Sequence, residues 1–302
     1  MLRLNKLLLT GITLLASCIF ANGQGCSDAG FCTAPGIQPE HKSENNKNKL
    51  RAGAGLGSAD YSIAILSSYI TYTRELNDRF NLSAKLTYLR QSGNGISASG
   101  LGDFYINSEI KFTQKFSGNI GVKLPLNNAD KSISGLPLPM DYQSSLGTTD
   151  LIAGLSYNVS NWIFALAVQQ PLTQNNNQFL SELYPEGSSL RNIQSTNQFQ
   201  RSGDGLLRAS YAINTNGNFI FTPGLLAIYH FTEDKYTTAE NMVTNIQGSD
   251  GLTLNGNFYF DYLLNEQHEL QLIFAFPFLV REARPDGLTR SFILNLQYSF
   301  NF

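Results

Sequence analysis

The chain has 302 residues and a formal net charge of −2, with 15% charged and 12% aromatic residues. The charged fraction lies below the roughly 25% that is usual for soluble domains. A near-neutral charge without a cluster of lysine and arginine argues against a nucleic-acid partner. Few charges, many aromatic residues and a slightly negative mean hydropathy are typical of a membrane β-barrel, in which only every second strand residue faces lipid.

The amino terminus has the layout of an export signal. A basic start and an apolar run that ends at Phe20 are followed by Ala21-Asn22-Gly23. This layout predicts a secretory signal peptide over residues 1–23, with cleavage after Gly23. The apolar run is shorter than the ~20 residues that a spanning helix needs, so a retained helical anchor is not expected. The alternative is cleavage before a lipidated Cys18, which follows a Leu-Ala-Ser sequence.

Residues 24–49 are polar and rich in glycine, proline, asparagine and lysine, and we expect a flexible periplasmic lead-in. Export would place Cys26 and Cys32 in an oxidising compartment, where a disulfide between them is expected. A metal site is not expected, because two thiols without a nearby histidine pair cannot complete a tetrahedral site. The disulfide-closed loop would be either an ordered tail or a partial plug at the periplasmic mouth.

From residue 50 onward, segments of alternating apolar and polar residues are separated by turns. Period-two alternation predicts β-strands with one apolar face. We expect about twelve of them, an even number as in bacterial barrels, over residues 50–57, 61–73, 80–91, 100–112, 119–126, 146–157, 162–172, 203–213, 218–231, 251–264, 269–281 and 289–302. The last segment alternates with a single break at Ile293 and ends on Phe302, as the closing strand of an outer-membrane barrel does.

The connections differ in length in a regular way. After the first hairpin, short turns alternate with longer polar segments, which are 92–99, 127–145, 173–200, 232–250 and 282–288. Outer-membrane barrels have short periplasmic turns and longer external loops, whereas a soluble sandwich has no reason to sort its loops by length. The sequence therefore predicts an all-β fold, a transmembrane antiparallel outer-membrane β-barrel over residues 50–302.

Strand parity assigns the two faces of the wall. Aromatic residues near the short-turn ends are expected to form an interfacial girdle; they are Tyr72, Phe112, Tyr157, Trp162, Tyr211, Phe219, Tyr262 and Tyr298. The residues expected to line the lumen are Lys85, Asp103, Tyr105, Asn107, Glu109, Lys111, Lys123 and Arg208. Their charges would either select solutes in a narrow channel or pair with one another and fill the lumen.

Three prolines, Pro125, Pro171 and Pro277, lie close to the predicted outer ends of strands. Proline cannot donate a hydrogen bond to the sheet, so each marks a bulge or the end of strand pairing. The alternative is that these breaks admit a ligand sideways through the wall.

Signatures of enzymes are missing from the sequence. It contains no Gly-x-Ser-x-Gly elbow, no Walker loop and no His-Glu-x-x-His pair. His230 lies near an outer strand end, where we expect a solvated rim histidine rather than a member of a lipase-type triad. We therefore expect no catalytic residues, no metal and no cofactor.

The segment Gly100-Leu-Gly-Asp103, the alternation over 105–111 that follows it, and Gly121-Val-Lys-Leu-Pro125 resemble a known family. It comprises outer-membrane transporter-like proteins associated with phenol-degradation pathways, distant relatives of the long-chain fatty-acid channels. The resemblance implies a barrel that passes hydrophobic or aromatic compounds, and it assigns no catalytic residues. The chain departs from the fatty-acid channels in lacking an obvious long apolar amino-terminal plug.

Together these features predict a passive channel or transporter in the outer membrane of a Gram-negative bacterium, for small hydrophobic or aromatic solutes. Its expected partners are outer-membrane lipid and the solute. One alternative is a structural barrel with a closed lumen whose loops bind an unidentified partner. The other is a membrane-embedded enzyme that acts on lipid.

Overall fold

The computed structural model describes residues 37–39, 46–215, 217–287 and 291–302. Its main sheet has thirteen strands, of which the two-residue β11 (Ile213–Asn214) only continues the line of β10. The twelve long strands are β1 (Asn48–Ser58), β2 (Ala64–Asn77), β3 (Phe80–Gly93), β4 (Ile96–Lys111), β5 (Phe116–Pro125), β8 (Asp150–Val159), β9 (Trp162–Pro171), β10 (Asp204–Tyr211), β12 (Phe219–His230), β15 (Gly251–Leu263), β16 (His268–Leu279) and β17 (Phe292–Asn301). Each of the twelve predicted strands is confirmed.

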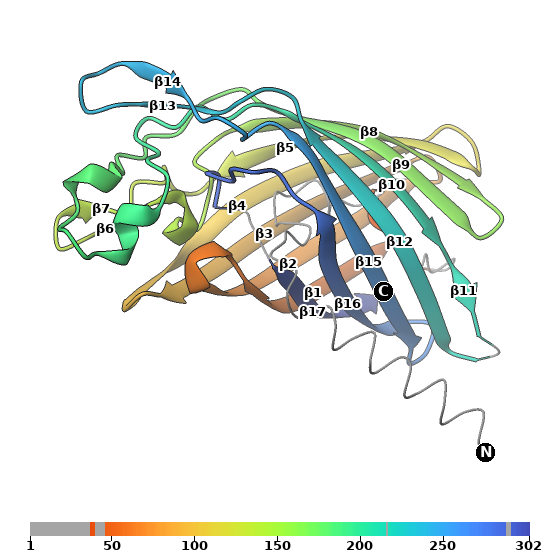
Figure 1. The fold of residues 1–302 in the computed structure, drawn as a ribbon. Coiled ribbons are helices and arrows are strands. Elements are labelled where there is room, and N and C mark those ends of the chain that lie inside the picture. Colours follow the sequence, from red (N-terminus) through yellow and green to blue (C-terminus); the bar gives the residue numbers. More distant parts are fainter. Residues whose placement is uncertain (1–36, 40–45, 216, 288–290) are drawn as a thin grey trace, which may run out of the picture.

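The sheet closes on itself as an antiparallel barrel (Figure 1). Each long strand pairs with its neighbours along the chain, and β1 pairs with both β2 and β17. The β10–β12 pair continues the wall past the short β11. Within the described residues the barrel sheet therefore has no long free edge that another strand could pair with.

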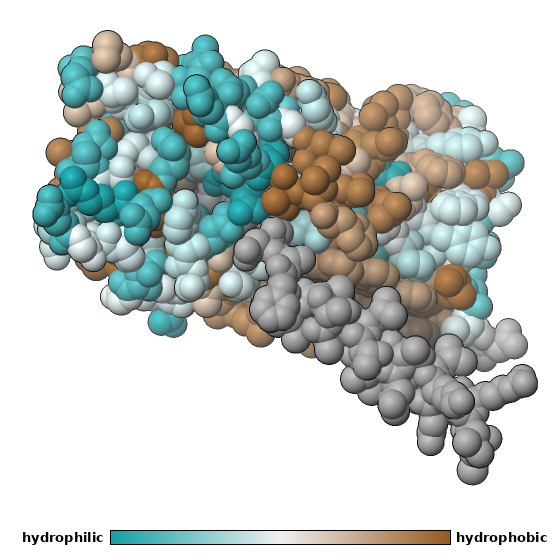
Figure 2. Space-filling view, viewed as in Figure 1, coloured by the Kyte–Doolittle hydropathy of each residue, from teal (hydrophilic) through white to brown (hydrophobic). Residues whose placement is uncertain are grey.

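The wall carries its apolar side chains on the outside. On β17, Leu294, Leu296 and Tyr298 are exposed, whereas the polar residues between them are buried. On the face in view, Figure 2 shows a band of hydrophobic surface over the middle of the barrel, next to a hydrophilic end. A soluble protein rarely exposes so large a contiguous apolar surface, so this band is suited to lipid.

The expected girdle residues take the positions that parity gave them. All eight aromatic side chains are exposed near the ends of strands on the short-turn side. Trp162 packs edge-on against Tyr211 of the neighbouring strand, with ring centroids 5.0 Å apart. Among the described residues, no helix is long and apolar enough to cross a membrane.

The long connections gather at one end of the barrel, here called the long-loop end (Figure 1). The β5–β8 connection carries the small hairpin of β6 (Ser132–Ile133) and β7 (Leu136–Pro137) and the 3₁₀ helix η4 (Met140–Tyr142). The other short elements there are η3 (Asp60–Ser62), η5 (Ser181–Leu183), η6 (Ser189–Asn192), β13 (Lys235–Thr237) and β14 (Val243–Asn245). The predicted sorting of connections by length is confirmed, with one exception.

The exception is the segment 92–99, for which a long loop was the wrong prediction. Strands β3 and β4 continue to Gly93 and from Ile96, joined only by Asn94 and Gly95. Both turn residues have positive φ, at 51° and 75°, as the tight Asn-Gly hairpin turn requires. The serines around this turn belong to paired strands.

Other boundaries moved by a few residues. β2 begins at Ala64 because residues 60–62 form η3, and β8 begins at Asp150 because residues 146–149 belong to the preceding loop. Pro277 of β16 faces Asn255 at an irregularity in the pairing with β15. Pro125 and Pro171 are the last residues of their strands. The prediction that the prolines mark bulges or strand ends is thus confirmed.

Candidate functional site: the barrel interior and its long-loop mouth

Seven of the eight predicted lumen residues are buried on the inner side of the wall, and Lys111, close to a turn, is partly exposed. They come from β3, β4, β5 and β10, and their buried side chains are Lys85, Asp103, Tyr105, Asn107, Glu109, Lys123 and Arg208. Their inward direction follows from the alternation with exposed neighbours. The partners that the structure gives them are mostly other inner-wall groups.

A fully buried ion pair joins β5 to β8. Lys123 Nζ lies 2.8 Å from Asp150 Oδ2, with neither side chain exposed, and donates to Thr148 Oγ1 at 3.0 Å. Gln169 of β9 donates to the same Asp150 carboxylate. The sequence prediction missed Asp150 as a partner, although it faces Lys123 in the strand register. Removing one member of such a pair leaves an uncompensated buried charge.

A second group ties the β5–β8 connection to the inner wall. Ser145 Oγ donates to Asp103 Oδ1 at 2.5 Å, and Gln91 Nε2 donates to the Gln143 carbonyl at 2.7 Å. The loop backbone lies so close to β4 that a Cβ at Gly102 would sit 2.7 Å from the carbonyl oxygen of Ser144. Part of this connection therefore folds against the inner face of β3 and β4.

Toward the short-turn end the inner charges have different partners. Lys85 Nζ lies 4.4 Å from the centre of the Tyr69 ring, a cation–π distance. Glu109 accepts a hydrogen bond from Asn81 at 2.8 Å. Lys111 pairs with Glu75 at 2.7 Å, a carboxylate that the sequence prediction did not single out.

Arg208 contacts a part of the chain outside the strands. Its guanidinium donates to the carbonyl oxygen of Ile37 at 2.6 Å. Ile37 is 1% exposed and belongs to an apolar cluster with inner-wall residues, which are Tyr105, Ile152, Ala165, Ala167, Leu206 and Leu226. Residues 37–39, part of the predicted lead-in, thus lie buried inside the barrel. The expectation of a flexible lead-in did not anticipate this.

His230 is not the solvated rim residue that the sequence suggested. Its ring is 1% exposed, with Nδ1 2.7 Å from Asp204 Oδ1 and Nε2 2.8 Å from Asp234 Oδ1. Each ring nitrogen faces a carboxylate, so neither faces a serine as a lipase-type triad requires. The histidine instead joins β12 to β10 and to the following loop.

The same network extends into the loops through arginines. Arg201 pairs with Asp204, and Arg281 Nη2 lies 3.0 Å from Asp286 Oδ2. Burial raises the pKa of Asp286, but the charges of Arg281 and Arg201 outweigh it and hold that pKa below its usual range. This loop carboxylate therefore remains ionised while it is enclosed by the network.

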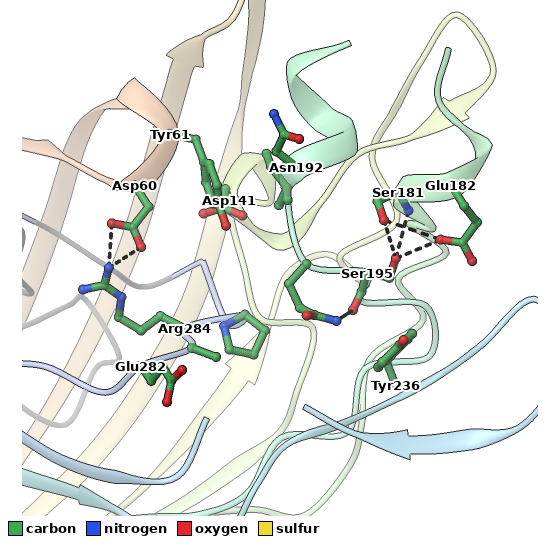
Figure 3. Close-up of a pocket in the computed structure, with 14 residues that line it drawn as sticks. Asp60, Tyr61, Asp141, Ser181, Glu182, Asn192, Ser195, Tyr236, Glu282 and Arg284 are labelled. Atoms are coloured by element: carbon green, nitrogen blue, oxygen red, sulfur yellow. Dashed lines mark hydrogen bonds and ion pairs between the residues drawn. The ribbon is translucent and has the colours of Figure 1, made fainter. Parts of the chain in front are cut away.

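A cavity of about 680 Å³ lies among the connections at the long-loop end. Every connection there contributes to it except the β3–β4 hairpin. Figure 3 shows Asp60 paired with Arg284, at 2.7 Å, and Glu182 near Ser181 and Ser195. Burial raises the pKa of Asp60, with Arg284 acting in the opposite direction. Asp141 and Glu282 add two further carboxyl groups to the lining.

The described residues contain no group of three or more histidine, cysteine, aspartate and glutamate side chains that could hold a metal ion. Cys18, Cys26 and Cys32 lie outside the described residues. The disulfide and the cleavage site therefore stay predictions.

No protein-family model matches the chain, and no curated protein matches it either. Among solved structures, the COG4313 outer membrane channel from Pseudomonas putida F1 is similar, with a TM-score of 0.56 and 16% identity over 87% of this chain and 100% of that one. The NanC porin has a TM-score of 0.47 and 10% identity, over 84% of this chain and 98% of that one. At these identities the likeness to the first structure shows the fold alone, a closed twelve-stranded barrel of the outer-membrane type.

Proposed function

We propose that this protein is a passive outer-membrane channel for small solutes in a Gram-negative bacterium. The observation that carries the proposal is the inverted wall: exposed apolar side chains form the outer surface, and buried polar and charged side chains face inward. Such a barrel is stable in lipid and offers a polar path across it. The likeness of the fold to a solved outer membrane channel supports the same function.

The proposed route begins at the acidic cavity of the long-loop end and continues past the inner-wall residues predicted from the sequence. We assign the long-loop end to the cell exterior, since outer-membrane barrels place long loops outside. Within the barrel, the two pairs Lys123–Asp150 and Asp103–Ser145 would narrow the route from one side. The buried ion pair fits the expectation that some inner charges pair with one another.

For the solute class we propose small hydrophobic or aromatic compounds. The resemblance of the sequence to proteins associated with phenol degradation suggests this class. The inner wall also has an apolar surface, formed by Ile152, Leu206 and Leu226 beside Tyr105, which a solute would reach when Ile37 leaves it. A solute with a small apolar body and a polar group would contact both kinds of lining.

A liposome-swelling assay with the purified protein tests the channel. We expect swelling that falls with increasing solute size, and faster swelling with small phenols than with sugars of equal mass. The matched control is protein unfolded before reconstitution. If correctly folded protein gives no more swelling than empty liposomes for any solute, the channel proposal is wrong. Equal rates for phenols and sugars would contradict only the solute class.

The chief rival is a closed barrel whose loops bind a partner, and the buried inner ion pair favours it. A conductance measurement in planar bilayers separates the two, because a closed barrel carries no current. For the lipid-acting enzyme, release of fatty acid from phospholipid vesicles is the corresponding test. The carboxylates on both sides of His230 argue against that rival.

We further propose that residues 1–23 are removed on export and that Cys26 and Cys32 are joined by a disulfide in the mature chain. Mass spectrometry of the non-reduced mature protein tests both. A chain that begins at Gln24 and loses two free thiols is the expected result. A lipid on Cys18 would contradict the cleavage site, and two reactive thiols would contradict the disulfide.

A further inference from the structure

One part of the inner wall is apolar, although the rest is mainly polar. The inward positions of β9, β10 and β12 align across the strands in two rows, Ala165–Arg208–Leu226 and Ala167–Leu206–Ile228. Ile152 of β8 joins the same cluster. Apart from Arg208, these side chains offer no hydrogen bond to water. An apolar patch inside a barrel gains stability when another apolar group covers it.

In this structure the patch is covered by Ile37. The Ile37 side chain packs in the cluster, and its carbonyl oxygen accepts the hydrogen bond from Arg208 at 2.6 Å. A hydrogen bond from a charged donor is shorter and stronger than one between neutral groups. The apolar patch and the guanidinium together therefore match two adjacent groups of one residue, a branched side chain and a peptide carbonyl.

The next residue reaches a different part of the wall. Gln38 Nε2 donates to Gln271 Oε1 of β16 at 3.1 Å, and Gln271 contacts Asp261 and Gln297 on the two neighbouring strands. Pro39 is also buried. The segment 37–39 thus bridges from β10 to β16 inside the barrel, across the space that a solute would need.

We propose that the inner wall is a receptor site for residues 37–39 of the same chain, and that this bound segment restricts passage through the lumen. The site selects a branched aliphatic side chain next to a peptide carbonyl. The proposal rests on the proposed channel function, because restriction has a meaning only for a conducting barrel. It differs from a plug made by the Cys26–Cys32 loop, since the contacts belong to residues beyond that loop.

The test of restriction changes the segment and leaves the wall intact. The double substitution Ile37→Gly with Gln38→Ala removes both side-chain contacts, and Lys47→Ala, at an exposed position next to β1, is the matched control. In planar bilayers we expect a severalfold rise in single-channel conductance for the double variant and no change for the control. An unchanged conductance in a conducting double variant would overturn the proposal.

A labelling experiment tests the location of the segment without any need for current. In the exported mature protein with Cys26→Ser and Cys32→Ser, the substitution Ile37→Cys should react slowly with a hydrophilic maleimide, and Lys47→Cys should react fast. Adding Leu206→Asp should speed the first reaction, because it places a charge in the patch. Equally fast labelling at positions 37 and 47 would overturn the receptor site. If neither the parent nor the double variant conducts while position 37 stays protected, the channel function and the restriction are both contradicted. The binding of residues 37–39 to the inner wall would then still stand.

Discussion

The barrel wall and the connections at its long-loop end sort their side chains in opposite ways. On the wall, Leu296 is 55% exposed and its polar neighbours are buried. In the connections, Tyr142 and Phe179 have no exposed surface and lie in an ordinary hydrophobic core with Ile63, Leu190 and Ile193. One chain thus follows two rules, because its middle is built for lipid and its long-loop end for water.

A second contrast lies inside the barrel. From β3 to β5 the inner wall carries charged and amide side chains, which bind the β5–β8 connection. From β8 to β12 it carries an apolar patch, which binds Ile37. Each of these two parts of the wall is thus covered by a different, non-strand segment of the chain. Substitutions in these regions test both contrasts.

The largest expected effect concerns the buried pair on the polar side of the wall. Asp150→Leu leaves the Lys123 ammonium buried without its carboxylate, which should cost about 3–5 kcal/mol of stability. Adding Lys123→Met removes the orphaned charge and should restore much of that loss. Urea unfolding in lipid vesicles gives the measurement. A double variant as unstable as the single one would show that the pair acts through shape and not charge.

The next prediction compares one change in the two regions. Leu296 of the wall and Leu183 of η5 are almost equally exposed, at 55% and 57%. Leu296→Arg should cost about 2–4 kcal/mol, because it places a charge in the lipid-facing band. Leu183→Arg should lie within about 0.5 kcal/mol of the parent, as surface changes in water do. Similar costs at the two positions would contradict the assignment of two solvents.

A smaller effect should follow from acid at the long-loop end. The arginines around Asp286 lower its pKa in the folded protein, so its contribution to stability is present above the unfolded pKa, about 3.9, and is lost as the pH falls through the folded value. We expect faster proteolysis within residues 280–287 on acidification, while the strands stay protected. Asp286→Asn should lose this pH dependence. The prediction is wrong if the parent protein is cleaved at the same rate at neutral pH and after acidification.

The smallest effect separates two turns. Gly95 has a φ of 75° in the β3–β4 hairpin, so Gly95→Ala should cost about 1–2 kcal/mol, although no atom obstructs the new methyl group. Gly217, in the turn before β12, has equal space and no such backbone constraint. Gly217→Ala should therefore be neutral within error in the same unfolding assay. A tolerated Gly95→Ala would mean that the hairpin adopts another turn type.

The strands could be predicted because lipid imposes a strict alternation on residues that are neighbours in sequence. The same alternation placed Asp103, Lys123 and Arg208 on the inner wall. It also places Asp150 on the inner wall. The pairing of Asp150 with Lys123, however, depends on the register between strands, which no local pattern contains. The Asn94-Gly95 pair by itself predicts a tight turn, but the serines around it favour a longer loop.

The other parts of the site depend on contacts between distant segments. The hydrophobic core around Tyr142 and Phe179 leaves no periodic apolar pattern in the sequence, because each connection supplies only a few of its residues. The burial of His230 could not be predicted, because Asp204 and Asp234 approach it from another strand and from a loop. Ile37 lies in a polar segment with no sign of burial, and the apolar residues around it come from five strands, from Tyr105 of β4 to Leu226 of β12, more than a hundred positions apart.

The meeting of the first and last strands has a consequence for the order of assembly. The backbone of Asn48 exchanges two hydrogen bonds with that of Phe302, at 3.0 and 2.8 Å, across a separation of 254 residues. Such distant pairing is slow, because the intervening chain must be arranged before its ends can join. Until then β1 and β17 each present an unpaired edge, which is prone to aggregation. We therefore expect closure to be the late, rate-limiting event of folding, and the chain to need protection in an open form until its last residues have paired.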